Sequence, residues 1–97
     1  MFISVFNLKY PVRVKYVKKL KWGKAPCMGI YEWDSDKQIH IIKIDSSVKG
    51  DSYMNTLAHE YIHAWQCEMG LKLSHGRTFK FWSEYLREYG YTVSKFQ

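Results

Sequence analysis

The residues best placed to do chemistry are two histidines that flank a glutamate in the sequence His59-Glu60-Tyr61-Ile62-His63. On a helix, residues four apart lie one above the other, so the rings of His59 and His63 can bind one metal ion. Glu60 lies one position further round the helix than His59, where it can reach a water on that ion and act as a general base. This spacing is typical of zinc hydrolases, in which a metal-activated water attacks the substrate.

A catalytic zinc site has three protein ligands and leaves one position for water. Cys67 continues the four-residue spacing, but a helix rises about 12 Å between His59 and Cys67, which is too far for one ion. Gln66 and Met69 occupy the positions where a metzincin would have glycine and histidine, and this excludes that class. The third ligand must therefore come from outside this helix.

Two later residues are candidates for the third ligand. His75 lies in a short segment, residues 71–76, between two predicted helices, and Gly76 gives the backbone freedom to turn its neighbour inward. Glu84 lies on the second predicted helix, at a distance in sequence where other zinc peptidases carry a glutamate ligand. We expect His75 to bind the metal, with Glu84 as the alternative.

The sequence around these residues resembles the SprT-like metallopeptidases. The similar segments are Met28-Gly29-Ile30-Tyr31, Gln38-Ile39-His40-Ile41, the His-Glu-x-x-His motif with Ala64-Trp65-Gln66, and His75-Gly76-Arg77-Thr78-Phe79 with Trp82. Together they span roughly residues 27 to 85. The resemblance implies a zincin-like fold in which His59, His63 and His75 bind one Zn²⁺ ion and Glu60 is catalytic.

The same family includes the Spartan proteases, which degrade DNA–protein crosslinks, so the resemblance also implies a protein substrate associated with nucleic acid. Fuller members have additional helical sequence at the N-terminus, and many bacterial members end in a cysteine-rich zinc ribbon. This chain contains two cysteines, Cys27 and Cys67, and no Cys-x-x-Cys. We therefore expect a minimal version of the family's domain.

The metal-binding motif requires a long helix, and the sequence predicts one over residues 51–69. The segment contains no proline or glycine, and its apolar residues recur at steps of three and four. Asp51 or Ser52 is the expected N-cap, and Gly70 follows where helices often end in glycine. The two histidines thus fall in the middle of a helix that is largely buried.

Strands are predicted before this helix and a second helix after it. Residues 12–17 alternate apolar and basic side chains, as in a half-buried strand, and residues 27–33 and 38–44 form two more strands. Tyr91 to Phe96 is predicted to add a strand or to cover an edge of the sheet. The second helix is predicted over residues 77–89, with an inner face made of Phe79, Trp82, Tyr85, Leu86 and Tyr89. The predicted fold class is α+β: a short three- to four-stranded sheet, mainly within residues 1–45, packed on two helices.

The basic charge is concentrated in the first third of the chain. Residues 1–31 contain seven Lys or Arg and no acid, whereas residues 32–97 contain eight basic and nine acidic residues. In a nucleic-acid-binding surface, lysines would contact phosphates and an indole would stack on a base. The candidates for such a surface are Lys15, Lys18, Lys19, Lys21, Lys24 and Trp22. The alternative is a solvated strand edge, where lysines prevent sheets from pairing with one another.

Composition and cysteine spacing argue against a membrane protein and against an exported, disulfide-bonded protein. No stretch approaches the roughly 20 apolar residues of a membrane span, and the apolar residues 1–8 lack the basic start of an export signal. Cys27 and Cys67 lack the spacing of a disulfide scaffold, so we expect free thiols in a reducing compartment. The expectation is a single domain over residues 1–97, monomeric and cytoplasmic, with no membrane association.

Three functions fit these residues. The first is a zinc endopeptidase with Glu60 as general base, which binds an unfolded or nucleic-acid-associated protein along an exposed strand; residues 37–45 are the predicted edge. The second is a non-catalytic protein with a structural zinc ion, whose basic strands contact nucleic acid or a protein partner. The third is a non-peptidase metal hydrolase, although Cys27-Met28-Gly29 does not match the cysteine motif of the peptide deformylases.

Overall fold

The structure is a computed structural model, and it describes residues 5–94 of the chain. Within that range it contains five strands and two helices, an α+β arrangement as predicted. The strands are β1 (Val12–Val17), β2 (Lys21–Trp22), β3 (Ala25–Pro26), β4 (Gly29–Asp34) and β5 (Ile39–Asp45). The helices are α1 (Gly50–Glu68) and α2 (Arg77–Arg87).

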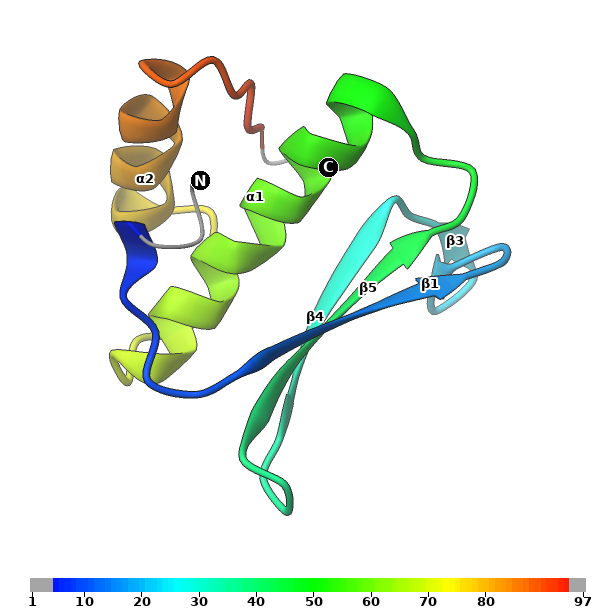
Figure 1. The fold of residues 1–97 in the computed structure, drawn as a ribbon, viewed down its shortest axis with the longest axis horizontal. Helices are drawn as coiled ribbons and strands as arrows, with labels where there is room; N and C mark the ends of the chain where they lie inside the picture. Colours follow the sequence, from blue (N-terminus) through cyan, green and yellow to red (C-terminus); the bar gives the residue numbers. More distant parts are fainter. Residues whose placement is uncertain (1–4, 95–97) are drawn as a thin grey trace.

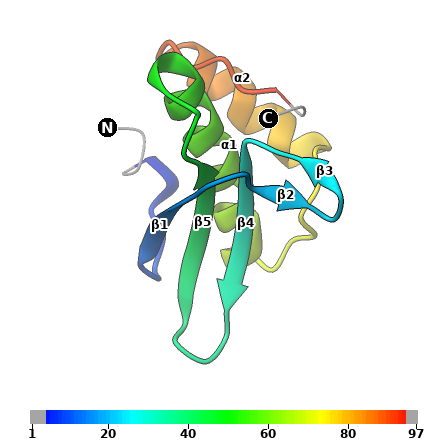
Figure 2. The same cartoon turned by 90° about the vertical axis from the view of Figure 1, so that its right-hand side faces the viewer.

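The main sheet has three strands in the order β1-β5-β4, so β5 is central and β4 is an outer strand. β1 runs parallel to β5, with Val12 opposite His40, and β4 runs antiparallel to β5, with Gly29 opposite Ile44. β2 and β3 form a separate two-stranded ribbon, which lies next to β4 in Figure 2. The prediction that residues 37–45 form the substrate-binding edge is therefore wrong, because β5 has a strand on each side.

α1 lies between the sheet and α2 (Figure 1). Toward the sheet it buries Ala58 and Ile62 in the same core as Ile42 and Ile44 of β5, and all four side chains are fully buried. Alternate residues of β5 are buried, as expected for a strand with one face against a helix. α1 is therefore covered on both sides, and this explains why its buried residues extend around most of the helix.

α1 lies one residue earlier than predicted, and its N-cap differs from the prediction. Lys49 is the N-cap of α1 and makes no side-chain capping bond, so the prediction of Asp51 or Ser52 as N-cap is wrong. Gly50 has a φ of +63°, which turns the chain into the helix early and puts Asp51 in the first turn, beside the positive end of the helix dipole. At the other end, Gly70 has a φ of +71°, as predicted for a residue that ends a helix.

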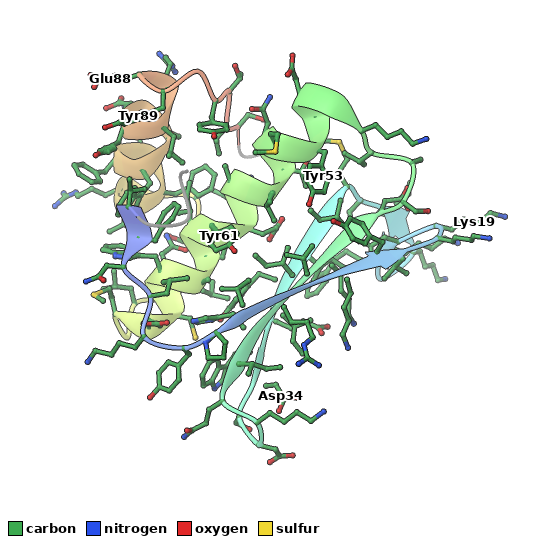
Figure 3. All side chains as sticks on the ribbon, in the orientation of Figure 1. Lys19, Asp34, Tyr53, Tyr61, Glu88 and Tyr89 are labelled. Carbon is green, nitrogen blue, oxygen red and sulfur yellow. The ribbon has the colours of Figure 1, made fainter. Side chains whose placement is uncertain are left out.

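α2 ends at Arg87, two residues before the predicted end. Its inner face is correct for Phe79, Trp82 and Leu86, which are buried. Tyr89 is 61% exposed because it lies in the turn after the helix, where helical spacing no longer applies. Figure 3 shows Tyr89 at this end of α2, directed away from α1.

The segment after α2 returns to α1 as an irregular chain (Figure 1). The backbone N–H of Thr92 donates a hydrogen bond to Asn55 Oδ1 at 3.0 Å, which fixes residues 91–94 against the first half of α1. The prediction of a strand is wrong for residues 91–94, whereas residues 95 and 96 lie outside the described part of the chain. Neither described helix combines the length and the apolar character that crossing a membrane requires.

Candidate metal centre

Three histidines converge on one point between α1 and the segment before α2. His59 Nε2 lies 3.2 Å from His63 Nε2 and 3.2 Å from His75 Nε2, and the three candidate ligand atoms all lie within 4.8 Å of one another. Two nitrogens bound at 2.0–2.1 Å to one tetrahedral ion would be about 3.3 Å apart. The spacing of the histidine nitrogens therefore fits a single ion of the size of Zn²⁺.

The hydrogen bonds of the outer ring nitrogens determine which atoms face this point. His59 Nδ1 donates to the backbone carbonyl of Ser94 at 2.8 Å, and His63 Nδ1 donates to Gln66 Oε1 at 2.9 Å. A neutral imidazole carries one proton, so both Nε2 atoms present a lone pair toward the centre. Two lone pairs that face each other at 3.2 Å repel, and a cation between them removes the repulsion.

Protonation of the rings is disfavoured. Burial, with the neighbouring His63, lowers the pKa of His59 to about 3. Burial also lowers the pKa of His63. The imidazoles of His59 and His63 are therefore neutral at physiological pH, which is the form that binds a metal ion.

Glu60 is 2% exposed and faces β4. Burial raises the pKa of its carboxyl to about 8, so the group binds a proton readily near neutral pH, and a nearby cation would lower that pKa. Gly29 leaves the space that the carboxylate occupies: a Cβ at Gly29 would lie 3.1 Å from Glu60 Oε2 and 2.7 Å from Thr56 Cγ2. Glycine in the strand thus permits the close approach of α1 to β4.

The centre opens into a cavity of about 380 Å³. Gly29, Ile30 and Tyr31 of the outer strand β4 form one part of its wall. Trp22 of the β2–β3 ribbon and Leu73 of the segment before α2 also line it, and their side chains are 71% and 46% exposed. The wall of the cavity therefore contains three candidate metal-binding nitrogens, a buried carboxyl, part of an outer strand and two exposed apolar side chains.

The SprT-like family model matches residues 5–95, nearly the whole chain. The chain belongs to the SprT-like family. Searches of the curated proteins and of the solved structures returned no match. Membership of the SprT-like family is consistent with a zinc metallopeptidase, and His59, His63 and His75 form a site that could hold a metal ion.

Glu84, the alternative third ligand, and Cys67, which helical geometry excludes, both lie outside the histidine group of this SprT-like chain. Glu84 is exposed on α2, where it borders a shallow hollow with Phe81 and Glu88, and it is outside the histidine group. Cys67 is a free thiol, and it is also outside that group. Among the described residues, the group of potential ligands therefore contains His75 and not Glu84.

The candidate basic residues of this SprT-like chain lie on β1, on the β2–β3 ribbon and in the turns between these strands. All five candidate lysines and Trp22 are exposed, and none of these lysines forms an ion pair with a described carboxylate. Lys19 and Lys21 line a second hollow of about 380 Å³, and Cys27 belongs to the walls of both this hollow and the site cavity. Of the six candidates, Trp22 alone lines the site cavity within the described chain.

Three residues have roles at the centre that the sequence analysis does not predict. Gly29 carried a signal, because a glycine within an apolar strand often marks a close approach of another element. Gln66 follows His63 by three residues, so the two side chains are neighbours on the helix surface. Ser94 acts through its backbone carbonyl, and this role leaves no trace in the residue type.

Proposed function

We propose that the chain is a zinc-dependent endopeptidase. His59, His63 and His75 would hold one Zn²⁺ ion through their Nε2 atoms. Bound zinc would supply the positive charge that makes a water more acidic and polarises a peptide carbonyl. The observation that carries the proposal is the position of a buried carboxyl beside three converging nitrogens, in the wall of an open cavity.

Glu60 is the proposed general base and acid. Its carboxylate accepts a proton from the attacking water as the new C–O bond forms. It then gives the proton to the departing amine nitrogen as the peptide C–N bond breaks, so the carboxylate is regenerated. Burial supports this role because it raises the proton affinity of Glu60 above that of an exposed glutamate.

The proposed substrate is an extended segment of an unfolded protein. β4 is an outer strand of the sheet and borders the cavity, so a peptide can pair with it as an added strand. Backbone pairing does not depend on side chains, which favours a broad range of sequences. Trp22 and Leu73 favour an apolar side chain close to the bond that is cut, because both expose apolar surface in the cavity wall.

The variant Glu60→Gln separates catalysis from metal binding. With one zinc per chain, the unmodified protein should cleave a reduced, denatured protein, and Glu60→Gln should retain the zinc but lose at least about 100-fold in rate. Glu84→Gln is the matched control, because it makes the same change on the exposed side of α2 and should alter neither quantity.

Two results would count against the proposal. Cleavage by Glu60→Gln at the unmodified rate would show that another group is the base. A zinc-loaded protein that cleaves no unfolded substrate would favour a structural zinc ion in a binding protein.

A second function, contact with nucleic acid, is favoured by the lysines beside the cavity. Lys19 and Lys21 line the hollow next to the site. Lys19 lies in the turn after β1, at the right-hand side of the molecule in Figure 3. These lysines have no carboxylate partner within residues 5–94 and can neutralise phosphates, and the exposed indole of Trp22 can stack on a base. We propose that a single strand of nucleic acid contacts this surface while a protein attached to it reaches the site.

Charge reversal tests this second function. Binding of single-stranded DNA, measured over a salt series, should weaken with salt and should be lost when Lys18, Lys19 and Lys21 are changed to Glu. Reversal of the exposed lysines at positions 37, 72 and 80 is the control for net charge and should leave most of the affinity. An affinity that is independent of salt, or an equal loss in the control, would contradict the proposal.

A further inference from the structure

We propose that Gln66 is a positioning residue that couples two histidines of the metal centre, His63 and His75, although these lie on different elements. The inference rests on the proposed metal centre and goes beyond it, because it names the side chain that aligns one ligand with the other. Gln66 is fully buried near the end of α1.

All the hydrogen-bonding capacity of the Gln66 amide is used within the site. Oε1 accepts from His63 Nδ1 at 2.9 Å and from the backbone N–H of Ser74 at 3.3 Å. Nε2 donates to the backbone carbonyl of Ser74 at 3.1 Å and to Thr78 Oγ1 at 2.9 Å. A glutamine has two acceptor positions and two donor protons, so each is matched to a partner.

The backbone of Ser74 fixes the orientation of this amide. A carbonyl can only accept and an N–H can only donate, so the nitrogen of the amide must face the Ser74 carbonyl and the oxygen must face the Ser74 N–H. The amide oxygen is then also the atom that faces His63. His63 must carry its proton on Nδ1, and its Nε2 lone pair must point toward the centre.

The same amide holds the segment that carries His75. Ser74 immediately precedes His75, and Thr78 lies in the first turn of α2, so Gln66 binds the chain on both sides of the exposed third histidine. Gly76, the N-cap of α2, has no side chain with which to cap the helix, and Gln66 of α1 supplies two hydrogen bonds to the backbone of Ser74 just before it. One buried side chain thus sets the ring state of His63 and the position of His75.

A buried glutamine could instead serve stability alone, and zinc affinity distinguishes the two roles. Substitution of a purely structural residue would lower the stability of the protein with and without zinc by the same amount. Substitution of a positioning residue would also lower the affinity for zinc, typically by about 10- to 100-fold.

Two substitutions at Gln66 and one at Thr78 make the comparison. Gln66→Met keeps the length of the side chain but cannot hydrogen-bond to the histidine or the loop, so we expect zinc binding, measured by chelator competition, to weaken about 10- to 100-fold. Gln66→Glu keeps an acceptor for His63 and should weaken zinc binding less than Gln66→Met. Thr78→Val removes one of the four bonds and should change zinc affinity less than about threefold.

The ring state of His63 gives a readout that needs no zinc and no cleavage. In the unmodified, metal-free protein, ¹⁵N chemical shifts should show the proton of His63 on Nδ1, and in Gln66→Met both ring forms should be populated. A proton on Nε2 in the unmodified protein would overturn the proposal even if Gln66→Met did not fold. Unchanged zinc affinity in Gln66→Met, or an equal loss in Thr78→Val, would also overturn it. If the unmodified protein bound no zinc, the proposed metal centre would be wrong. The ring measurement would still test whether Gln66 sets the position of the His63 proton.

Discussion

At the residue scale, Gly29 controls the position of Glu60. In Gly29→Ala the new methyl group would lie 2.7 Å from Thr56 Cγ2 and 3.1 Å from the glutamate oxygen, so α1 or the carboxylate must shift. We expect at least a tenfold loss in kcat/KM for an unfolded substrate, with the zinc content unchanged, since a small misplacement of a catalytic group is costly.

A second substitution tests this explanation. Thr56→Ser removes the methyl group that the new alanine would strike, so Gly29→Ala combined with Thr56→Ser should recover a large part of the activity. If the double variant were as inactive as Gly29→Ala, the close contact with Thr56 would not be the cause.

Glu68 makes the stability of the protein depend on pH. Burial alone would raise the pKa of Glu68, but hydrogen bonds from His40 Nε2 and from the backbone N–H groups of Lys9 and Tyr10 outweigh burial and lower it. A lowered carboxyl pKa adds stability above the unfolded value of about 4.3, and this is lost as the pH falls through the folded pKa. Stability should therefore fall below about pH 4.3.

The variant Glu68→Gln measures this contribution. Without the charged acceptor, the free energy of unfolding at pH 7 should fall by roughly 2 kcal/mol, and its decrease between pH 5 and pH 3 should become shallower. Urea denaturation of the metal-free protein is the appropriate measurement, because zinc loss at low pH is then avoided. Glu32→Gln, which breaks a more exposed pair with Lys43, is the control and should leave the slope unchanged. An unchanged slope in Glu68→Gln would refute the assignment.

Helical spacing explains which site residues the sequence could reveal. The roles of His59, Glu60 and His63 depend on positions within one helix, so the pattern alone predicts them. His75 follows from its place in a short segment between helices, together with the family resemblance. The Ser94 carbonyl could not be predicted, because its position results from the return of the chain after α2.

At the scale of elements, α1 begins without a side-chain cap. Lys49 occupies the N-cap with an extended backbone and no side-chain bond to the first turn. In Lys49→Ser the hydroxyl can accept from the free N–H of Asp51 or Ser52, so we expect a gain of about 1 kcal/mol in the free energy of unfolding. Urea denaturation measures the gain.

The control for this prediction is Lys72→Ser, which removes the same charge from an exposed position outside the helices. It should change stability by less than about 0.5 kcal/mol. An equal gain in both variants would attribute the effect to net charge instead of capping.

The positions of the elements followed from local pattern, whereas their arrangement did not. β1, β4, β5 and both helices lie within a few residues of their predicted ranges, because periodicity and glycine positions are local signals. The order of the strands depends on pairing between distant segments: β1 pairs with β5 across the whole intervening ribbon and β4. The predicted substrate-binding edge is wrong for this reason, since the position of residues 37–45 just before α1 in sequence does not reveal that a strand pairs with them on each side.

At the scale of the whole molecule, a bound ion would connect layers that are otherwise held by a small core. α1 supplies two of the proposed ligands, and the segment before α2 supplies the third. Free zinc at 100 times its dissociation constant should therefore add about 2.7 kcal/mol to the free energy of unfolding. Urea denaturation with zinc and with a chelator measures this difference.

The variant His75→Ala tests whether the added stability arises from the bridge between the layers. It should remove most of the zinc-dependent increment, whereas Glu84→Ala should keep it. If zinc stabilised His75→Ala as much as the unmodified protein and failed to stabilise Glu84→Ala, the third ligand would be Glu84.

Anomalous diffraction at the zinc edge, from crystals of the zinc-loaded protein, tests the proposed metal centre most directly. The predicted result is one ion within about 2.0–2.1 Å of Nε2 of His59, His63 and His75, with the Glu60 carboxylate beside it and not bound to it. An ion bound through a different set of atoms, or zinc found only away from these histidines, would contradict the proposal.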